Sequence, residues 1–143
     1  NSEEGIERSY SEEEVCQEIE DQLGVFAIRL GYRPKGMILQ EYWIKKDQDA
    51  ILRYAYGDDQ IHIYISKDYN ESSIIFKMDG ELKETVQMEA MSMDVPIYEY
   101  EDSDGNMYYQ VSFEYLNTYY SISGMLEQDE FEKILENIII KNA

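Results

Sequence analysis

Side chains that could act as a nucleophile, a general base or a metal ligand are few in this chain. His62 is the one histidine of the 143 residues, so a histidine-based metal cluster or a serine–histidine relay would have to include it. No nucleophile signature accompanies His62, and its position on the polar side of a predicted strand indicates an ordinary half-exposed histidine. Cys16, the one cysteine, has acidic neighbours that disfavour a thiolate, so we expect a small buried hydrophobe there. The sequence therefore predicts no catalytic residue.

Acidic residues cluster at Asp102–Asn106, in a pattern similar to a calcium-binding loop. With Gly105 at the glycine position of such a loop, the first ligand position falls on Tyr100, and the bidentate glutamate has no counterpart. A hairpin turn explains the same residues, and we favour it. The glycines form no phosphate-binding pattern. We expect neither a metal site nor a cofactor.

Aromatic residues outside the predicted core rows are the one surplus in the sequence. They are Trp43, Tyr64, Tyr98, Tyr100, Tyr108 and Tyr119. Together they could form a surface for a peptide, a glycan or a lipid chain. They could instead form a second apolar layer under the terminal helices, and we favour that layer because aromatic residues prefer strands regardless of function.

The charge of the chain limits its partners. Twelve basic and 31 acidic residues give a formal net charge of -19. Phosphate backbones and anionic lipid headgroups repel such a chain, so we expect no nucleic acid partner and no direct binding to an anionic membrane surface. The carboxylates are scattered, which favours a role in solubility over cation storage. An unknown protein, a peptide or an apolar ligand is the expected partner.

The elements that must position these residues begin with a helix. Residues 1–10 are polar and are predicted to be a flexible lead-in, and residues 11–143 a single α+β domain. Ser11 and Glu14 form a capping box, which predicts a helix from Glu12 to Leu23 that ends at Gly24.

From Gly31 onward the apolar pattern alternates, and short turns of Asp, Asn and Gly recur, which predicts an antiparallel meander. The expected strands are Met37–Lys45, Ala50–Tyr56, Ile61–Ser66, Ser73–Met78, Leu82–Ala90, Val95–Glu101, Met107–Leu116 and Thr118–Ser123. Two apolar rows should face the core: Ile61, Ile63 and Ile65, and then Met107, Tyr109, Val111, Phe113 and Tyr115. The first strand carries apolar residues on both sides, so we expect it to be buried on both faces or covered by a helix.

A helical period returns after Gly124, with Phe131, Ile134, Leu135 and Ile138 on one stripe. Ile138–Ile140 is expected to be the end of this helix or a short strand. The predicted fold is α+β: an antiparallel meandering sheet, with strong curvature as a variant, and N- and C-terminal helices packed on one of its faces.

Two stretches carry a family resemblance. Leu30–Gly36 precedes the first long strand, and Tyr120–Gly124 leads into Glu130–Ile138. Together they resemble the bacterial domain-of-unknown-function family 4367 over most of the chain, from Leu30 to Ile138. The resemblance implies no catalytic residue. It does imply an extracytoplasmic domain, tethered to the membrane by a segment N-terminal to this sequence.

The expected function is a non-enzymatic extracytoplasmic binding or sensory module of unknown ligand, the soluble part of a membrane-anchored protein. The alternative is a hydrolase that uses acidic side chains. A deep cleft with two converging carboxylates would favour the hydrolase, and a flat or grooved aromatic face would favour binding.

Overall fold

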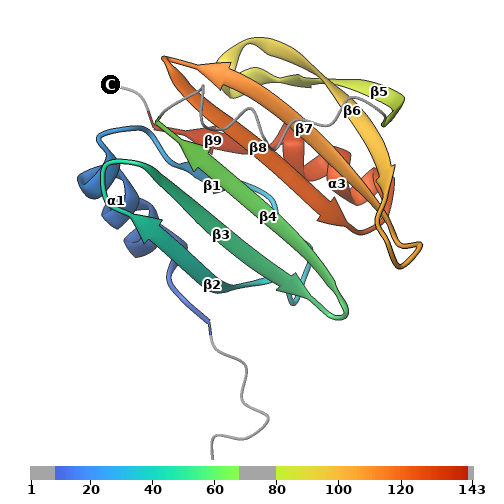
Figure 1. Cartoon of the computed structure of the whole chain (residues 1–143), viewed down its shortest axis with the longest axis horizontal. Coiled ribbons are helices and arrows are strands. Elements are labelled where there is room, and N and C mark those ends of the chain that lie inside the picture. The colour runs from blue at the N-terminus through green and yellow to red at the C-terminus, as the bar shows by residue number, and fades with distance from the viewer. Residues whose placement is uncertain (1–8, 68–79, 142–143) are drawn as a thin grey trace, which may run out of the picture.

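The computed structural model describes residues 9–67 and 80–141 of the chain (Figure 1). In chain order its elements are α1 (Glu12–Leu23), β1 (Ile28–Leu30), β2 (Ile38–Lys45), β3 (Asp49–Tyr56), β4 (Asp59–Ser66), β5 (Glu81–Met88), the 3-10 helix η2 (Glu89–Met91), β6 (Met93–Glu101), β7 (Met107–Tyr115), β8 (Thr118–Met125), α3 (Gln128–Glu136) and β9 (Ile138–Ile140). The expected strand Ser73–Met78 lies outside the described residues.

Seven strands form one open antiparallel sheet in the order β2-β3-β4-β8-β7-β6-β5. Successive hairpins connect β2, β3 and β4, and further hairpins connect β6, β7 and β8. These two groups of strands join where β4 pairs with β8. The shorter β1 and β9 form a separate antiparallel pair. The predicted antiparallel sheet with terminal helices is confirmed, and the β4–β8 pairing adds a feature that the turns did not reveal.

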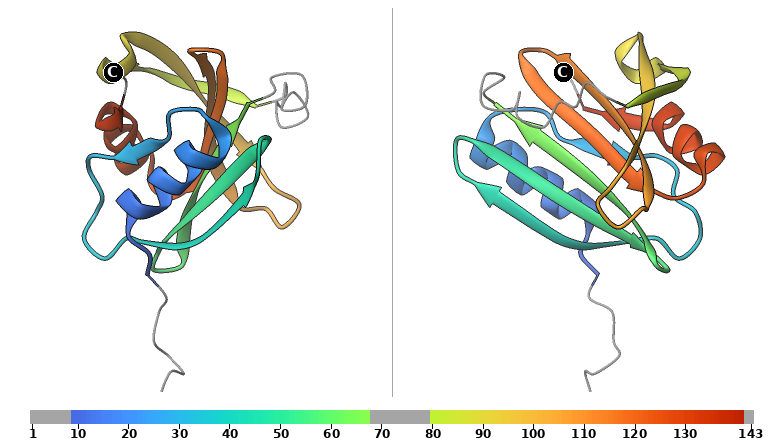
Figure 2. Two further views of the ribbon diagram at one scale, coloured as in Figure 1. Left: turned by 90° about the vertical axis from the view of Figure 1, so that its left-hand side faces the viewer. Right: turned by 45° about the vertical axis from the view of Figure 1, so that its right-hand side comes forward.

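Both helices and the β1–β9 pair lie on the same side of the large sheet, as the turned view on the left of Figure 2 shows. β5, at the far edge, contacts α3, so the sheet curves around that helix. The other side of the sheet carries no helix in the described part of the chain. The core therefore lies between one face of the sheet and the layer of helices, which is the two-layer arrangement expected from the sequence.

α1 forms over the residues predicted for it, with the expected signals at both ends. The Ser11 hydroxyl accepts a hydrogen bond from the backbone N–H of Glu14 at 3.3 Å. Gly24 ends the helix with a φ of 71°, a left-handed conformation that glycine adopts without strain.

Charged side chains fasten α1 to β1. Arg29 is 6% exposed, and its Nε and one terminal nitrogen donate to the two carboxylate oxygens of Glu13 at 2.7 and 3.0 Å. Its other terminal nitrogen donates to Glu20 at 3.0 Å. Glu12 accepts from the backbone N–H of Leu30 at 2.9 Å and from the hydroxyl of Tyr54 at 2.6 Å. These contacts place the N-terminal turn of the helix against both β1 and β3.

The predicted core rows face the core with one exception. Ile61, Ile63 and Ile65 are fully buried. In β7, Val111 and Phe113 are buried, and Tyr109 and Tyr115 are half-buried and pack against the core. Met107 is 46% exposed because it is the first residue of β7 and pairs with Glu101 at the end of the sheet. Its assignment to the core was therefore wrong.

A bulge in β2 explains why its sequence carries apolar residues at both alternating sets of positions. The register with β3 shifts between Leu39 and Glu41, which moves the side chains after the bulge to the opposite alternation. Leu39 is buried before the bulge, and Tyr42 packs against the core after it. Trp43 is 53% exposed, so β2 is covered on one face only.

α3 is fixed by its apolar stripe. Phe131, Ile134 and Leu135 are fully buried. The helix ends at Glu136, and Ile138 belongs to β9, where it pairs with Leu30. Ile138 is buried as expected, but as part of a strand and not of the helix. No helix in the described ranges is both long and apolar enough to cross a bilayer.

Candidate functional site

All six aromatic residues singled out in the sequence lie on the sheet face that the helices do not cover. In each strand they alternate with core residues, as Tyr64 does with Ile63 and Ile65. None of the six belongs to the core cluster. The second apolar layer under the helices, which the sequence favoured for them, is therefore wrong.

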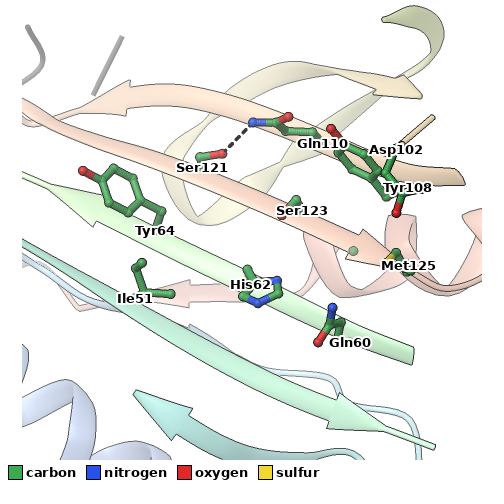
Figure 3. A pocket seen from close by; sticks show the side chains of 11 residues that line it. Ile51, Gln60, His62, Tyr64, Asp102, Tyr108, Gln110, Ser121, Ser123 and Met125 are labelled. Carbon is green, nitrogen blue, oxygen red and sulfur yellow. Dashed lines mark hydrogen bonds between the residues drawn. The ribbon is translucent and has the colours of Figure 1, made fainter. Parts of the chain in front are cut away.

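A groove of about 440 Å³ lies on this open face, and Figure 3 shows its lining. The two central strands supply most of it, namely Gln60, His62 and Tyr64 from β4 and Ser121, Ser123 and Met125 from β8. Because β4 pairs with β8, residues from the two halves of the chain come together here. The groove therefore depends on a strand pairing that the local sequence pattern did not predict.

The outer strands complete the groove. Ile51 comes from β3, Tyr108 and Gln110 from β7, and Asp102 from the turn between β6 and β7. The Oδ1 atom of Asp102 accepts hydrogen bonds from the backbone N–H groups of Asp104 and Asn106, both at 2.9 Å. This carboxylate holds the hairpin turn, as the sequence predicted in place of a calcium loop.

A buried hydrogen-bond network forms one side of the groove. Gln110 is 6% exposed, and its Nε2 donates to Ser121 Oγ at 3.0 Å, as drawn in Figure 3. The Ser112 hydroxyl donates to the same oxygen at 3.5 Å. Ser121 Oγ is thus an acceptor in both contacts, and its own O–H remains a donor. These hydrogen bonds fix the Gln110 amide and the Ser121 hydroxyl at this side of the groove.

His62 occupies the middle of the groove. On β4 it pairs with Arg53 of β3 on one side and with Ser123 of β8 on the other. Burial lowers the pKa of His62, and the positive charge of Arg53 lowers it further, while Glu41 acts in the opposite direction. The imidazole is therefore neutral at pH 7, when it has one donor and one acceptor nitrogen. Within the described residues no hydrogen bond joins His62 to Ser123 or Asp102.

Two tyrosines of the predicted set line the groove. The Tyr64 hydroxyl donates to Asp49 at 2.9 Å. The Tyr108 ring stacks on Tyr100 with centroids 5.5 Å apart and an interplanar angle of 25°. Gly80 lies so close to the Tyr100 ring that a Cβ there would overlap it. These contacts hold the Tyr64 and Tyr108 rings in fixed positions at the groove.

The other members of the predicted set differ in exposure. Trp43 is 53% exposed and pairs across the strands with Ile51, which lines the groove. Tyr98 is half-buried on β6. Tyr100 and Tyr119 are only 7% and 4% exposed. The set is therefore brought to one face, but a ligand could reach Trp43, Tyr64, Tyr98 and Tyr108 more readily than the other two.

Cys16 belongs to the core and not to the groove lining. It is fully buried in the core, its Sγ donates to the backbone oxygen of Ile28 at 3.4 Å, and burial raises its pKa to about 12. The thiol is therefore protonated at neutral pH, as expected for a small buried hydrophobe. No group of three or more His, Cys, Asp or Glu side chains able to hold a metal ion occurs among residues 9–67 and 80–141.

Sequence reasoning identified the aromatic part of the groove and missed its polar part. Gln60, Gln110, Ser121 and Ser123 have no motif of their own. Their signal was the alternation that places them opposite buried residues, such as Ser121 beside Ile122. That alternation assigns a face, but the gathering of the four side chains requires the strand order.

Comparisons with known proteins bear on the family of the chain. Neither a curated protein nor a solved structure matches it significantly. A family profile does match, over residues 27–138, which include β1, all seven strands of the large sheet, α3 and the first residue of β9. This confirms the resemblance seen in the sequence. The chain belongs to the family described as domain of unknown function (DUF4367).

Proposed function

We propose that this domain is a non-enzymatic binding or sensory module whose ligand occupies the groove on the open face of the sheet. The observation that carries the proposal is the groove itself, a cavity of about 440 Å³ built by four strands and one turn. Its volume lies within the range of small-molecule sites, and it combines aromatic rings with a few fixed hydrogen-bonding groups.

The lining supports binding over hydrolysis by acidic side chains. A glycosidase-type mechanism needs two carboxylates on either side of the scissile bond. Among the described residues that line the groove, Asp102 is the one carboxylate, and its Oδ1 already accepts two backbone hydrogen bonds. The described lining therefore favours recognition of a ligand over hydrolysis.

The location belongs to the same proposal. On the family resemblance, we place the domain outside the cytoplasmic membrane, tethered by a segment N-terminal to this sequence. Protease treatment of intact cells that express the full-length protein tests this placement. The domain should be cleaved in intact cells, and protection until the membrane is broken would contradict the proposal.

Binding at the groove can be tested by nuclear magnetic resonance with isotope-labelled domain. A panel of small molecules, short peptides and oligosaccharides is added, and the amide shifts are followed. We expect ligand-induced shifts to concentrate in β4, β7 and β8. Shifts confined to other parts of the molecule would contradict the assignment of the groove as the site.

A blocking variant provides the matched control. Ser123→Tyr places a ring into the groove and should abolish the response to any ligand found in the panel. Glu114→Tyr adds the same ring at an exposed position of β7 that is not part of the groove lining, and it should leave the response unchanged. Equal responses of the two variants would contradict the assignment of the groove as the binding site.

A further inference from the structure

The chemistry of the groove narrows the kind of ligand that it can take. Of the eleven described residues that line it, Asp102 is the one with a carboxylate, and none is a lysine or an arginine. The chain as a whole carries a formal net charge of -19, which repels anionic ligands. The Oδ1 atom of Asp102 already accepts two backbone hydrogen bonds in the hairpin turn, so this carboxylate is a poor anchor for a cationic ligand. The groove is therefore suited to an uncharged ligand.

The surface of the groove is mostly apolar, but its few hydrogen-bonding groups favour a ligand that carries hydroxyl groups over a purely apolar one. Gln60, Gln110, Ser121, Ser123 and the neutral His62 each combine donor and acceptor capacity. An apolar molecule would remove water from these groups and give no hydrogen bond in return, which is unfavourable. Ligand hydroxyl groups also donate and accept, so they suit the half-buried Gln60, His62 and Ser123, whereas Gln110 and Ser121 are buried and hydrogen-bonded to each other.

Aromatic and aliphatic surface lies directly beside these polar groups. Trp43, Ile51 and Tyr64 form one cross-strand row on β2, β3 and β4, and Ser121 continues it on β8. Trp43 lies beside the groove lining and is 53% exposed, so about half of its surface is accessible. A sugar ring has C–H groups on its faces and hydroxyls around its rim, and it fits a site where an aromatic platform adjoins amides and hydroxyls.

The position of the groove argues against an extended peptide. A peptide gains most of its affinity for a sheet by pairing its main chain with an edge strand. The strands under the groove, β3, β4, β8 and β7, are all internal and are paired on both sides. The edge strands β2 and β5 each carry a bulge, at Leu39–Glu41 and Leu82–Glu84, which disfavours strand addition.

We propose that the groove binds an uncharged oligosaccharide, with a sugar ring stacked on the Trp43 and Tyr64 side and ligand hydroxyls hydrogen-bonded to Gln60, His62 and Ser123. This inference rests on the proposed function, since it names the ligand class of the same site. The ligand crosses the strands from β2 towards β7, and the ion-paired Arg53 and Glu41 lie beside its path.

The test uses the folded domain and linear oligosaccharides of glucose, mannose and N-acetylglucosamine as neutral probes. Oligomers of galacturonic acid and of glucosamine are the anionic and cationic comparisons, and short neutral peptides are the third. Affinities are measured by calorimetry and the site by amide shifts. We expect at least one neutral oligosaccharide to bind at β4, β7 and β8, and both charged oligomers to bind more weakly.

Three variants locate the contact. Trp43→Ala should weaken binding of the neutral oligosaccharide about tenfold, since it removes one stacking platform. Ser123→Ala should weaken it by a similar or smaller factor. Ile139→Ala removes a side chain that is 51% exposed on β9, on the other side of the sheet, and should leave the affinity unchanged. Circular dichroism and denaturation midpoints verify that all three fold.

Two results overturn the inference, and they differ in what they say about the proposed function. If no neutral oligosaccharide binds but a peptide or an apolar probe shifts the groove residues, the ligand class is wrong and the binding module stands. If an oligosaccharide binds and its shifts lie outside the groove, with Trp43→Ala and Ser123→Ala both without effect, the site itself is wrong and both proposals fail.

Discussion

The two faces of the large sheet are made from the same strands and differ in what their side chains can do. On the covered face, Ile61, Ile63 and Ile65 are fully buried beneath the helices and the β1–β9 pair. On the open face of the same strand, Gln60, His62 and Tyr64 are half-buried and line the groove. One strand thus contributes to the core on one side and to the proposed binding groove on the other, and substitutions on the two faces should separate these contributions.

The largest loss of stability is expected where α3 meets the covered face. Phe131 is fully buried, and its ring lies 5.8 Å from that of Tyr109, centroid to centroid. Phe131→Ala should lower the free energy of unfolding by about 3 to 5 kcal/mol, because it removes a ring and leaves a cavity. Urea denaturation measures the change.

Glu136→Ala, an exposed position on the same helix, is the control and should stay within about 0.5 kcal/mol of the original protein. Equal and small losses for the two variants would mean that α3 is peripheral to the core.

Substitution of Gly124 gives a second test of the close packing on the covered face. A Cβ at this position would lie 2.8 Å from Leu126 Cδ2, 3.0 Å from Ile61 Cγ1 and 3.2 Å from Phe131 Cδ1. Gly124→Ala should therefore destabilise the domain by about 1 to 3 kcal/mol through overpacking. Ser123→Ala, one residue earlier and on the open face, should change the denaturation midpoint little. A loss as large for Ser123→Ala would show that the two faces do not differ in packing.

The covered face was largely predictable from the sequence because its signal is local. Alternation in β4 and the stripe of Phe131, Ile134 and Leu135 can be read from a few neighbouring residues. β1 was missed because it is only three residues long and contains the buried Arg29, whose burial depends on Glu13 and Glu20 of α1. β9 was ambiguous because three successive isoleucines suit the end of a helix as well as a strand.

The open face was predictable only in part. Alternation places Tyr64, Tyr108 and Tyr119 opposite core residues, but their common surroundings follow from the pairing of β4 with β8, whose residues lie more than fifty positions apart in the sequence. The bulge in β2 reversed the alternation before Trp43, so the sequence suggested burial on both sides. The polar groove residues could not be found without the strand order, since no motif connects them.

The ion pair between Glu13 of α1 and Arg29 of β1 allows a test of whether charge, as well as packing, stabilises the helix against its neighbouring strand. Hydrogen bonding to Arg29 lowers the pKa of Glu13 from 4.5 to about 2. A carboxylate with a depressed folded-state pKa stabilises the fold above its unfolded pKa, and this contribution is lost as the pH falls through the folded value. The Glu13 contribution should therefore be complete above pH 4.5 and disappear between pH 4.5 and about 2.

Thermal denaturation across this pH range, compared between the original protein and Glu13→Gln, measures the effect. The variant should be less stable near neutral pH, and the difference should shrink as the pH approaches 2. Glu14→Gln is the control, because Glu14 lies in the same helical turn and makes no hydrogen bond to Arg29 among the described contacts. A difference that persists unchanged to pH 2 would show that the Arg29 contact is not its source.

Trp43 should show the smallest effect on stability, although it carries the largest side chain of the open face. It is 53% exposed, whereas Leu52 on the neighbouring strand is fully buried. Trp43→Ala should change the free energy of unfolding by no more than about 0.5 kcal/mol, and Leu52→Ala should cost about 2 to 5 kcal/mol. Urea denaturation of both variants gives the comparison. A loss of about 2 kcal/mol or more for Trp43→Ala would mean that the indole is buried in solution, and the open face could then not offer it to a ligand.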